Sequence, residues 1–266
     1  MKPMRDFTWY VYRASCALIR LLFPEPEFTG LENLPQGRPS IVVGNHAHAY
    51  GPFYAELYLP FERATWCIGE MLNLKELPDY AFMDFWSKKP LWCRWFYRLL
   101  SYVIAPLCVA VLKNARCIGV YKDQRIMSTM RESLKHMKAG ENIVIFPEHE
   151  VPYNEIVWEF QEGFVNLASL YARQTAQPVD FVPMYIAPKL CRVCFGEPIA
   201  FDPSANPREE AHRVCVALME AVTALALTLP SHVAVPYPNL PKRKYISTES
   251  MKGTPAEKVT YEETCR

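Results

Sequence analysis

Two histidines stand directly after a short apolar run near the start of the chain. Residues 41–43 read Ile-Val-Val, the pattern of a buried strand, and the next five read Gly-Asn-His-Ala-His, which places histidines at positions 46 and 48. A histidine at the end of a buried strand lies at the edge of a sheet, where its imidazole can take a proton from a bound hydroxyl. His46 is therefore the first candidate for a general base.

A carboxylate follows a second apolar run about one hundred residues later. Residues 143–146 read Ile-Val-Ile-Phe and lead directly into Pro147, Glu148 and His149. This second strand end repeats the design of the first, with an apolar strand that runs into a titratable side chain. Glu148 is therefore the second candidate for acid–base chemistry.

The elements that must position these residues alternate along the chain. Apolar runs predict strands at residues 40–45, 64–68, 117–121, 142–146, 180–186 and 191–196. Helical patterns occur at residues 52–59, 123–138, 163–175 and 207–229. Gly140 stands where a helix would end before the strand at 142–146. The alternation predicts an α/β domain with a mostly parallel sheet flanked by helices.

The composition narrows the class of protein. The chain has 266 residues, enough for a sizeable core, and its formal net charge of +1 gives no general attraction to nucleic acid. Its nine cysteines lack paired spacing, so we expect a reducing compartment rather than a disulfide framework. Cys191 and Cys194 lie three apart in a strand-like run and would point to opposite faces, which argues against a shared metal.

Two stretches rich in aromatic and basic residues predict contact with a membrane surface. Residues 7–23 have helical periodicity, with leucines on one face and arginines on another, and residues 86–112 combine Trp and Tyr with Lys and Arg. The alternative for residues 7–23 is an ordinary amphipathic helix packed on the domain. No cleavable signal peptide is expected, and the longest apolar run, residues 99–112, is too short to span a bilayer. We expect a protein on the cytoplasmic face of a membrane.

These features divide the chain into three parts. Residues 1–27 are expected to form an amphipathic membrane-surface helix with a linker, and residues 28–232 the α/β domain. Residues 233–266 are rich in Pro, Lys and Glu without periodicity, and we expect a polar, mobile tail.

Five short motifs follow one another along the chain, at residues 28–35 with 45–46, 146–148, 160–163, 181–186 and 195–199. In order and spacing they resemble those of the glycerophospholipid acyltransferases, the lysophosphatidic acid acyltransferase family, over roughly residues 28–200. The resemblance implies a fold of the glycerolipid acyltransferase type. It also implies transfer of a fatty acyl group from a coenzyme A or carrier-protein thioester to a hydroxyl of a lysophospholipid-like or other lipid acceptor. No metal or other cofactor is required for this chemistry, and the expected partners are a lipid surface and the acyl donor.

The resemblance also assigns roles to individual residues. In the family the first block is His-x4-Asp, in which the aspartate orients the catalytic histidine, and carried over this makes His46 the general base. The aspartate position is occupied by Gly51, and the second block loses a glycine at His149 and the arginine that usually follows it. Glu148 would help to position the acceptor or the imidazole. The expected substrate-binding residues are His48, Gly51, Pro147, His149 and Lys122.

The missing aspartate leaves three interpretations open. A working acyltransferase needs another orienting carboxylate, for which the candidates are Glu56, Glu148 and Glu150, and His48 could replace His46 as the base. Alternatively, His46, His48 and His149 could join a glutamate in the metal cluster of a metal-assisted hydrolase. The third interpretation is a lipid-binding protein with a decayed acyltransferase site.

Overall fold

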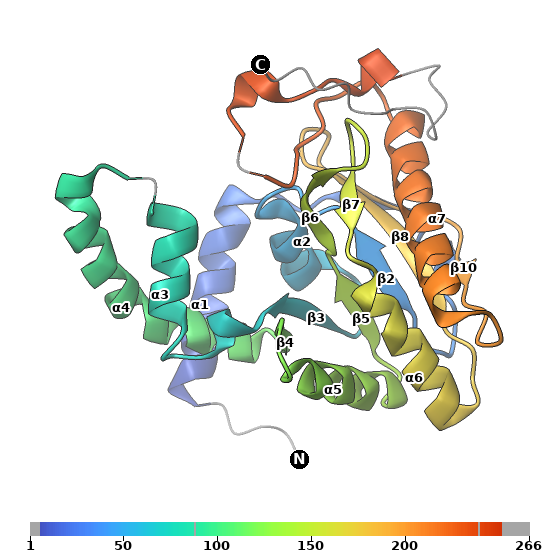
Figure 1. Ribbon diagram of the computed structural model, residues 1–266. Coiled ribbons are helices and arrows are strands. Elements are labelled where there is room, and N and C mark those ends of the chain that lie inside the picture. The colour runs from blue at the N-terminus through green and yellow to red at the C-terminus, as the bar shows by residue number, and fades with distance from the viewer. Residues whose placement is uncertain (1–5, 88, 239, 252–266) are drawn as a thin grey trace. The chain divides into compact units, whose positions relative to one another are not determined.

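The computed structural model (Figure 1) describes residues 6–87, 89–238 and 240–251, which fall into two units. The part that lies within Met1–Leu22 and Ala64–Ser133 is called the helical unit here. The part within Phe23–Arg63 and Leu134–Arg266 is called the sheet unit. The predicted domain boundaries at residues 27 and 232 stay predictions.

The sheet unit is built on strands that match the apolar runs of the sequence. Its strand order is β1-β9-β8-β2-β5, with β10 paired to β8. The pairs β1–β9, β8–β2 and β2–β5 are parallel, whereas β8–β9 and β8–β10 are antiparallel. The bounds are β1 Glu27–Thr29, β2 Ile41–Gly44, β5 Asn142–Ile145, β8 Asp180–Ala187, β9 Arg192–Phe195 and β10 Ile199–Ala200. The predicted α/β class with a mostly parallel sheet is confirmed.

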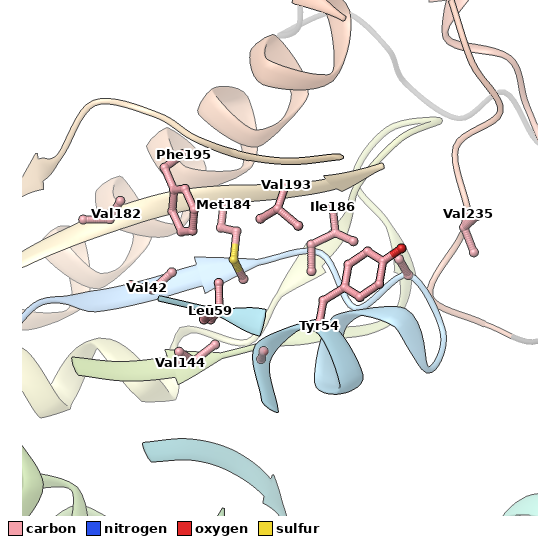
Figure 2. Packing of buried hydrophobic residues seen from close by; sticks show 12 residues of the cluster. Val42, Tyr54, Leu59, Val144, Val182, Met184, Ile186, Val193, Phe195 and Val235 are labelled. Atoms are coloured by element: carbon pink, nitrogen blue, oxygen red, sulfur yellow. The ribbon is translucent and has the colours of Figure 1, made fainter. Parts of the chain in front are cut away.

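Both faces of the central strands are buried, as is usual for parallel strands between helices. On one face, α2 (Tyr50–Tyr58) packs onto the sheet, and Figure 2 shows its Tyr54 among side chains from β2, β5, β8 and β9. On β8, Phe181, which precedes Val182, points to the opposite face of the sheet and contacts the ring of Phe164. Ile41 on β2 pairs in register with Phe181 on β8 and with Ile143 on β5. The ends of β2 and β5 therefore lie at the same level of the sheet.

Several helices begin and end where the local chemistry predicts. In α7 (Pro207–Thr228), the Asn206 side chain caps the first turn by accepting from the backbone N–H groups of Arg208 and Glu209, and the helix packs against β8 (Figure 1). Gly140 has a positive φ of 84° and ends α5 (Ile126–Lys138), as predicted. The predicted helix at 163–175 begins as a 3₁₀ turn, η4 (Glu162–Val165), and continues as α6 (Asn166–Thr175).

A short hairpin after β5 is absent from the sequence prediction. It pairs β6 (Glu148–Pro152) with β7 (Trp158–Phe160), antiparallel to each other. The turn is held by the buried Asn154, whose Oδ1 accepts from the backbone N–H groups of Ile156 and Val157 at 2.8 Å each. The strands are too short to alternate visibly in sequence, but they fix the position of Glu148.

The segment after residue 232 does not have the structure expected of a mobile tail, at least over its described residues. Val235, Thr248 and Met251 are buried, and Val233 forms an isolated antiparallel bridge with Ser247. The segment includes the 3₁₀ turns η5 (Lys242–Lys244) and η6 (Thr248–Met251). Its apolar anchors are spaced without period, so the sequence pattern did not reveal them. Residues 252–266 of the expected tail lie outside the described residues.

The helical unit contains the predicted N-terminal helix and a helical insertion. Here α1 (Phe7–Leu22) packs against α4 (Leu91–Asn114), and β3 (Arg63–Ile68) pairs in parallel with β4 (Cys117–Val120). In the sequence, η2 (Gly69–Leu72), α3 (Leu77–Ala81) and the π-helical turn η3 (Phe82–Trp86) lie between β3 and α4. Lys88, part of the predicted aromatic-basic block, lies outside the described residues.

The long helix α4 corrects the expectation that no segment is long enough to cross a bilayer. Within the described residues, α4 and α7 are long and apolar enough to do so by length and composition alone. A helix of the 24 residues of α4 is about 36 Å long. Arg94 and Arg98 interrupt the apolar sequence before residue 99, which is why the apolar run looked short. Whereas α7 packs on the sheet, few residues of α4 are buried, and Trp92 has 79% of its surface accessible.

Candidate active site

Asn45 locks the end of β2 to the neighbouring strand. Its side chain is buried, donates through Nδ2 to the carbonyl of Ile186 at 3.1 Å, and accepts through Oδ1 from the N–H of the same residue at 2.7 Å. These two bonds satisfy a backbone donor and acceptor at the point where β2 stops. The residue before His46 therefore fixes where the following loop begins.

We expect Asn45→Ala to destabilise the protein by about 2–4 kcal/mol, because it leaves two buried backbone groups of Ile186 without partners. Urea denaturation would measure the change. The matched control is Asn166→Ala at an exposed position, which should change stability by less than about 0.5 kcal/mol. Equal stability of the two variants would contradict the locking role of Asn45.

His46 lies in a tight loop between β2 and α2. The loop turns through positive φ angles at Ala47 (45°) and His48 (55°), and it closes with a hydrogen bond from the Gly51 N–H to the His46 carbonyl at 3.0 Å. Positive φ is uncommon for residues other than glycine and marks strain held by the surrounding structure. This turn places both histidines on the same loop, as the sequence predicts.

The imidazole of His46 contacts two aromatic rings. Its ring lies edge-on to Phe146 and to Tyr237, with centroid distances of 5.6 Å in both cases and interplanar angles of 67° and 79°. The Nδ1 atom is buried and, among the described residues, has no hydrogen-bond partner. Burial lowers the pKa of His46, the nearby backbone of His48 offsets part of this, and the His48 imidazole lowers it further. The imidazole is therefore neutral near pH 7.

Glu148 holds the backbone of His46 rather than its ring. The carboxylate is 3% exposed and accepts from the His46 N–H at 2.6 Å and from the Trp158 N–H at 3.0 Å. Burial raises the pKa of Glu148 to about 7, although the two N–H donors oppose the shift. The carboxylate thus ties β6, β7 and the end of β2 together. The sequence offered Glu148 as a residue that could position the His46 imidazole. It did not indicate Trp158, because a backbone donor leaves no signal in the residue type.

The other proposed substitutes for the missing aspartate do not contact Nδ1 of His46 either, since that atom has no partner within the described chain. Glu56 lies 3.7 Å from the guanidinium of Arg63. Glu150 is exposed on β6. None of the three glutamates considered from the sequence replaces the carboxylate at the imidazole.

Gly51 occupies the aspartate position because a side chain does not fit there. A Cβ atom on Gly51 would lie 2.6 Å from the His46 carbonyl oxygen and 3.0 Å from Cε1 of Phe146. The first of these distances is too short for any Cβ contact, and the neighbour is backbone. The ring of Phe146 and the tight turn have taken the space that an orienting side chain would need.

We therefore expect Gly51→Ala to destabilise the protein by about 1–3 kcal/mol, although replacing glycine by alanine inside a helix usually stabilises it. Gly51→Asp should also fail to raise activity, since the clash begins at Cβ. Thermal unfolding measures the first effect. Gly163→Ala, where nothing lies within 4 Å of the added Cβ, is the control. A more active Gly51→Asp variant would show that the site still accepts the carboxylate.

His48 is half-buried and is paired with a residue that the sequence did not single out. Its Nε2 lies 3.1 Å from the hydroxyl of Tyr245, and burial lowers its pKa. Tyr237 and Tyr245 both come from the segment after residue 232. Neither gave a signal in sequence, because they are nearly 200 residues away and lie in an aperiodic stretch.

The remaining expected site residues are spread more widely. Pro147 is buried next to Glu148, while His149 lies on β6 with its Nε2 3.2 Å from a carboxylate oxygen of Glu159. Lys122 is exposed and follows β4 in the helical unit. Substrate binding by these residues stays a prediction. Within the described chain, no group of three or more His, Cys, Asp or Glu side chains is arranged to hold a metal ion, so His46, His48 and His149 do not form the cluster considered from the sequence.

Comparison with known proteins places this geometry in a family. The model of the family described as Acyltransferase matches residues 25–187, more than half of the chain. The chain belongs to the acyltransferase family. The match spans β1 to β8 and includes His46, Gly51 and Glu148, and it confirms the resemblance stated from the motifs.

Two further comparisons are less informative about this acyltransferase. No curated protein matches the chain. Among solved structures, it is similar to the 1-acyl-sn-glycerophosphate (LPA) acyltransferase PlsC from Thermotoga maritima, with 17% identity, 84% coverage of each chain and a TM-score of 0.45. The family match ends at residue 187, so α7 and the segment that brings Tyr237 and Tyr245 to the histidines lie beyond it.

Proposed function

We propose that this acyltransferase moves a fatty acyl group from an acyl thioester to a hydroxyl of a lysophospholipid-like or other lipid acceptor. The donor would be an acyl-coenzyme A or an acyl carrier protein. The observation that supports this most strongly is His46 itself, a neutral imidazole at the end of a buried strand inside the region that matches the family. A neutral imidazole can accept a proton, whereas an imidazolium cannot.

The proposed reaction needs one base and no metal or other cofactor. Nε2 of His46 takes the proton of the acceptor hydroxyl as its oxygen attacks the thioester carbonyl. The tetrahedral intermediate then collapses, the C–S bond breaks, and the leaving thiolate takes the proton back from the imidazolium. The new ester and the free thiol account for all atoms. Glu148 would act by holding the His46 backbone in place, and it would not touch the substrate.

We further propose that the protein works at a membrane, on its cytoplasmic face. Exposed apolar side chains on α1 and α4 support the location at a membrane, together with the basic side chains of these helices, which are Arg13, Arg20, Arg94, Arg98 and Lys113. The exposed set on these helices includes Phe7, Tyr10, Leu18, Leu21, Leu22, Leu91, Trp92, Trp95, Phe96 and Leu99. Such a mixture of large aromatic and basic residues is favoured at a water–lipid boundary. A membrane would also supply an apolar acceptor and hold the apolar product.

Release of thiol from a long-chain acyl donor tests the proposal. Wild-type protein would be supplied with palmitoyl-coenzyme A or palmitoyl carrier protein in lipid vesicles, with lysophosphatidic acid, monoacylglycerol or no acceptor. Acceptor-dependent thiol release, with the acylated lipid identified by mass spectrometry, is expected. Vesicle binding without release from either donor would contradict the proposal and support the decayed lipid-binding protein.

A further inference from the structure

The segment of residues 232–248, called the C-terminal strap here, is anchored at both ends. His232 is buried, its Nε2 lies 2.8 Å from the hydroxyl of Tyr185 on β8, and its Nδ1 lies 2.8 Å from the carbonyl of Pro230. At the other end, the Thr248 N–H donates to the His232 carbonyl at 2.8 Å. The two ends of the strap are thus joined to each other and to the sheet. Residue 239 lies outside the described residues.

Between these anchors the strap reaches both histidines of the β2–α2 loop. Val235 enters the core cluster, and Figure 2 shows it on the strap at the end of the cluster where Tyr54 and Ile186 lie. Two residues further on, the ring of Tyr237 lies edge-on to His46 at 5.6 Å. Tyr245 approaches His48 at 3.1 Å on the way back. In Figure 1 the strap, in red, runs close to the start of α2.

A second aromatic ring, that of Phe146, also lies edge-on to the imidazole with a centroid distance of 5.6 Å. Gly51 leaves no room for a side chain at the aspartate position, and Nδ1 of His46 has no hydrogen-bond partner among the described residues. Hydrogen bonding therefore does not set the orientation of the ring through Nδ1. The contacts with the rings of Phe146 and Tyr237 can set it instead.

We propose that Tyr237 is a positioning residue, which with Phe146 fixes the plane of the His46 imidazole by edge-to-face packing in place of the missing orienting carboxylate. Aromatic rings prefer this geometry, and a ring in edge-on contact with two others has fewer orientations open to it. The idea rests on the proposed role of His46 as base. Because Tyr237 lies outside the matched residues 25–187, the strap supplies this residue from beyond the part of the chain shared with the family model.

Three substitutions test this, each measured for kcat and KM with the acyl donor and acceptor that support turnover. Tyr237→Ala should lower kcat at least about tenfold with little change in KM, since a base free to rotate is rarely aligned. Tyr237→Phe keeps the ring edge and should stay within about threefold of wild type. Lys242→Ala, at an exposed position of the same strap, should match wild type. A fall in Tyr237→Phe equal to that in Tyr237→Ala, or a change in KM alone, would overturn the proposal.

Histidine NMR on the full chain provides a readout that needs no turnover, with the His46 resonance assigned by its loss in His46→Ala. The titratable groups that face this residue are His48, Tyr237 and the Glu148 carboxylate on its backbone. Removing the Tyr237 ring admits water, so the pKa of His46 should rise towards its ordinary value in Tyr237→Ala and stay unchanged in Tyr237→Phe. An unchanged titration in Tyr237→Ala would refute the packing role, even if wild-type protein showed no acyl transfer and the proposed function had failed.

Discussion

Replacing His46 by alanine should lower acyl transfer at least about 10³-fold while the fold remains. General bases contribute about 10²–10⁴-fold to the rates of the reactions they assist, and His46 is the histidine at the end of the buried strand. The steady-state rate of acceptor-dependent thiol release measures the loss. The deficit should appear in kcat as well as in kcat/KM, because the proton transfer belongs to the chemical step.

The fold should survive this substitution for a structural reason. The bond from His46 to Glu148 comes from the backbone N–H, which alanine retains, and Nδ1 has no hydrogen bond to lose. We expect a change in the free energy of unfolding within about 1 kcal/mol. The matched control is His212→Ala, an exposed histidine on α7 paired with Glu162, which should leave activity unchanged. If the His46→Ala variant were active, His46 would not be the base, and His48 would be tested next.

The strand ends were predictable because they depend on local composition. Short apolar runs at residues 41–43 and 143–146 predict buried strands, and parallel pairing then brings their ends together at one edge of the sheet. The sequence therefore offered Glu148 as one of three candidates to orient His46, and the structure brings Glu148 to the His46 backbone. It could not predict that the carboxylate binds the backbone of His46 rather than the ring, since side-chain direction depends on the unpredicted β6–β7 hairpin.

The strap shows the limit of pattern reading more clearly. Pro, Lys and Glu without periodicity are typical of mobile segments, yet residues 233–251 have several buried side chains. Single anchors such as Val235 and Thr248 fix such a segment without a repeat, through contacts to strands far away in sequence. Tyr237 and Tyr245, which contact the two histidines, left no pattern in the sequence for the same reason. The helix α4 was underestimated because Arg94 and Arg98 interrupt its apolar sequence, whereas in the structure they lie on one continuous helix.

Glu148→Gln should change the pH dependence of stability, because the pKa of Glu148 is raised by burial to about 7 from 4.5. Between these values the folded state holds a proton that the unfolded state has lost, so the stability contributed by this group falls as pH rises from about 4.5 to about 7. Glutamine does not titrate. The free energy of unfolding of the variant, relative to wild type, should therefore improve by about 3 kcal/mol across this window.

Urea denaturation of both proteins at pH 4.5 and pH 8 measures this difference, in which the other carboxylates cancel since both proteins contain them.

The activity of Glu148→Gln at pH 8 should fall, whereas its stability relative to wild type should rise. Glutamine can accept only one of the N–H bonds from His46 and Trp158, and its amide group would face the other donor. The loop that holds His46 then loses its anchor, and a displacement of about 1 Å in such a group can cost about 10²-fold in rate. We expect a fall in kcat of at least about tenfold. Glu148 would thus lower stability above pH 7 and still support activity. Its role in positioning the base would explain why a buried carboxylate is present there. A stability difference that does not vary with pH would mean that Glu148 titrates alike in the folded and unfolded chains.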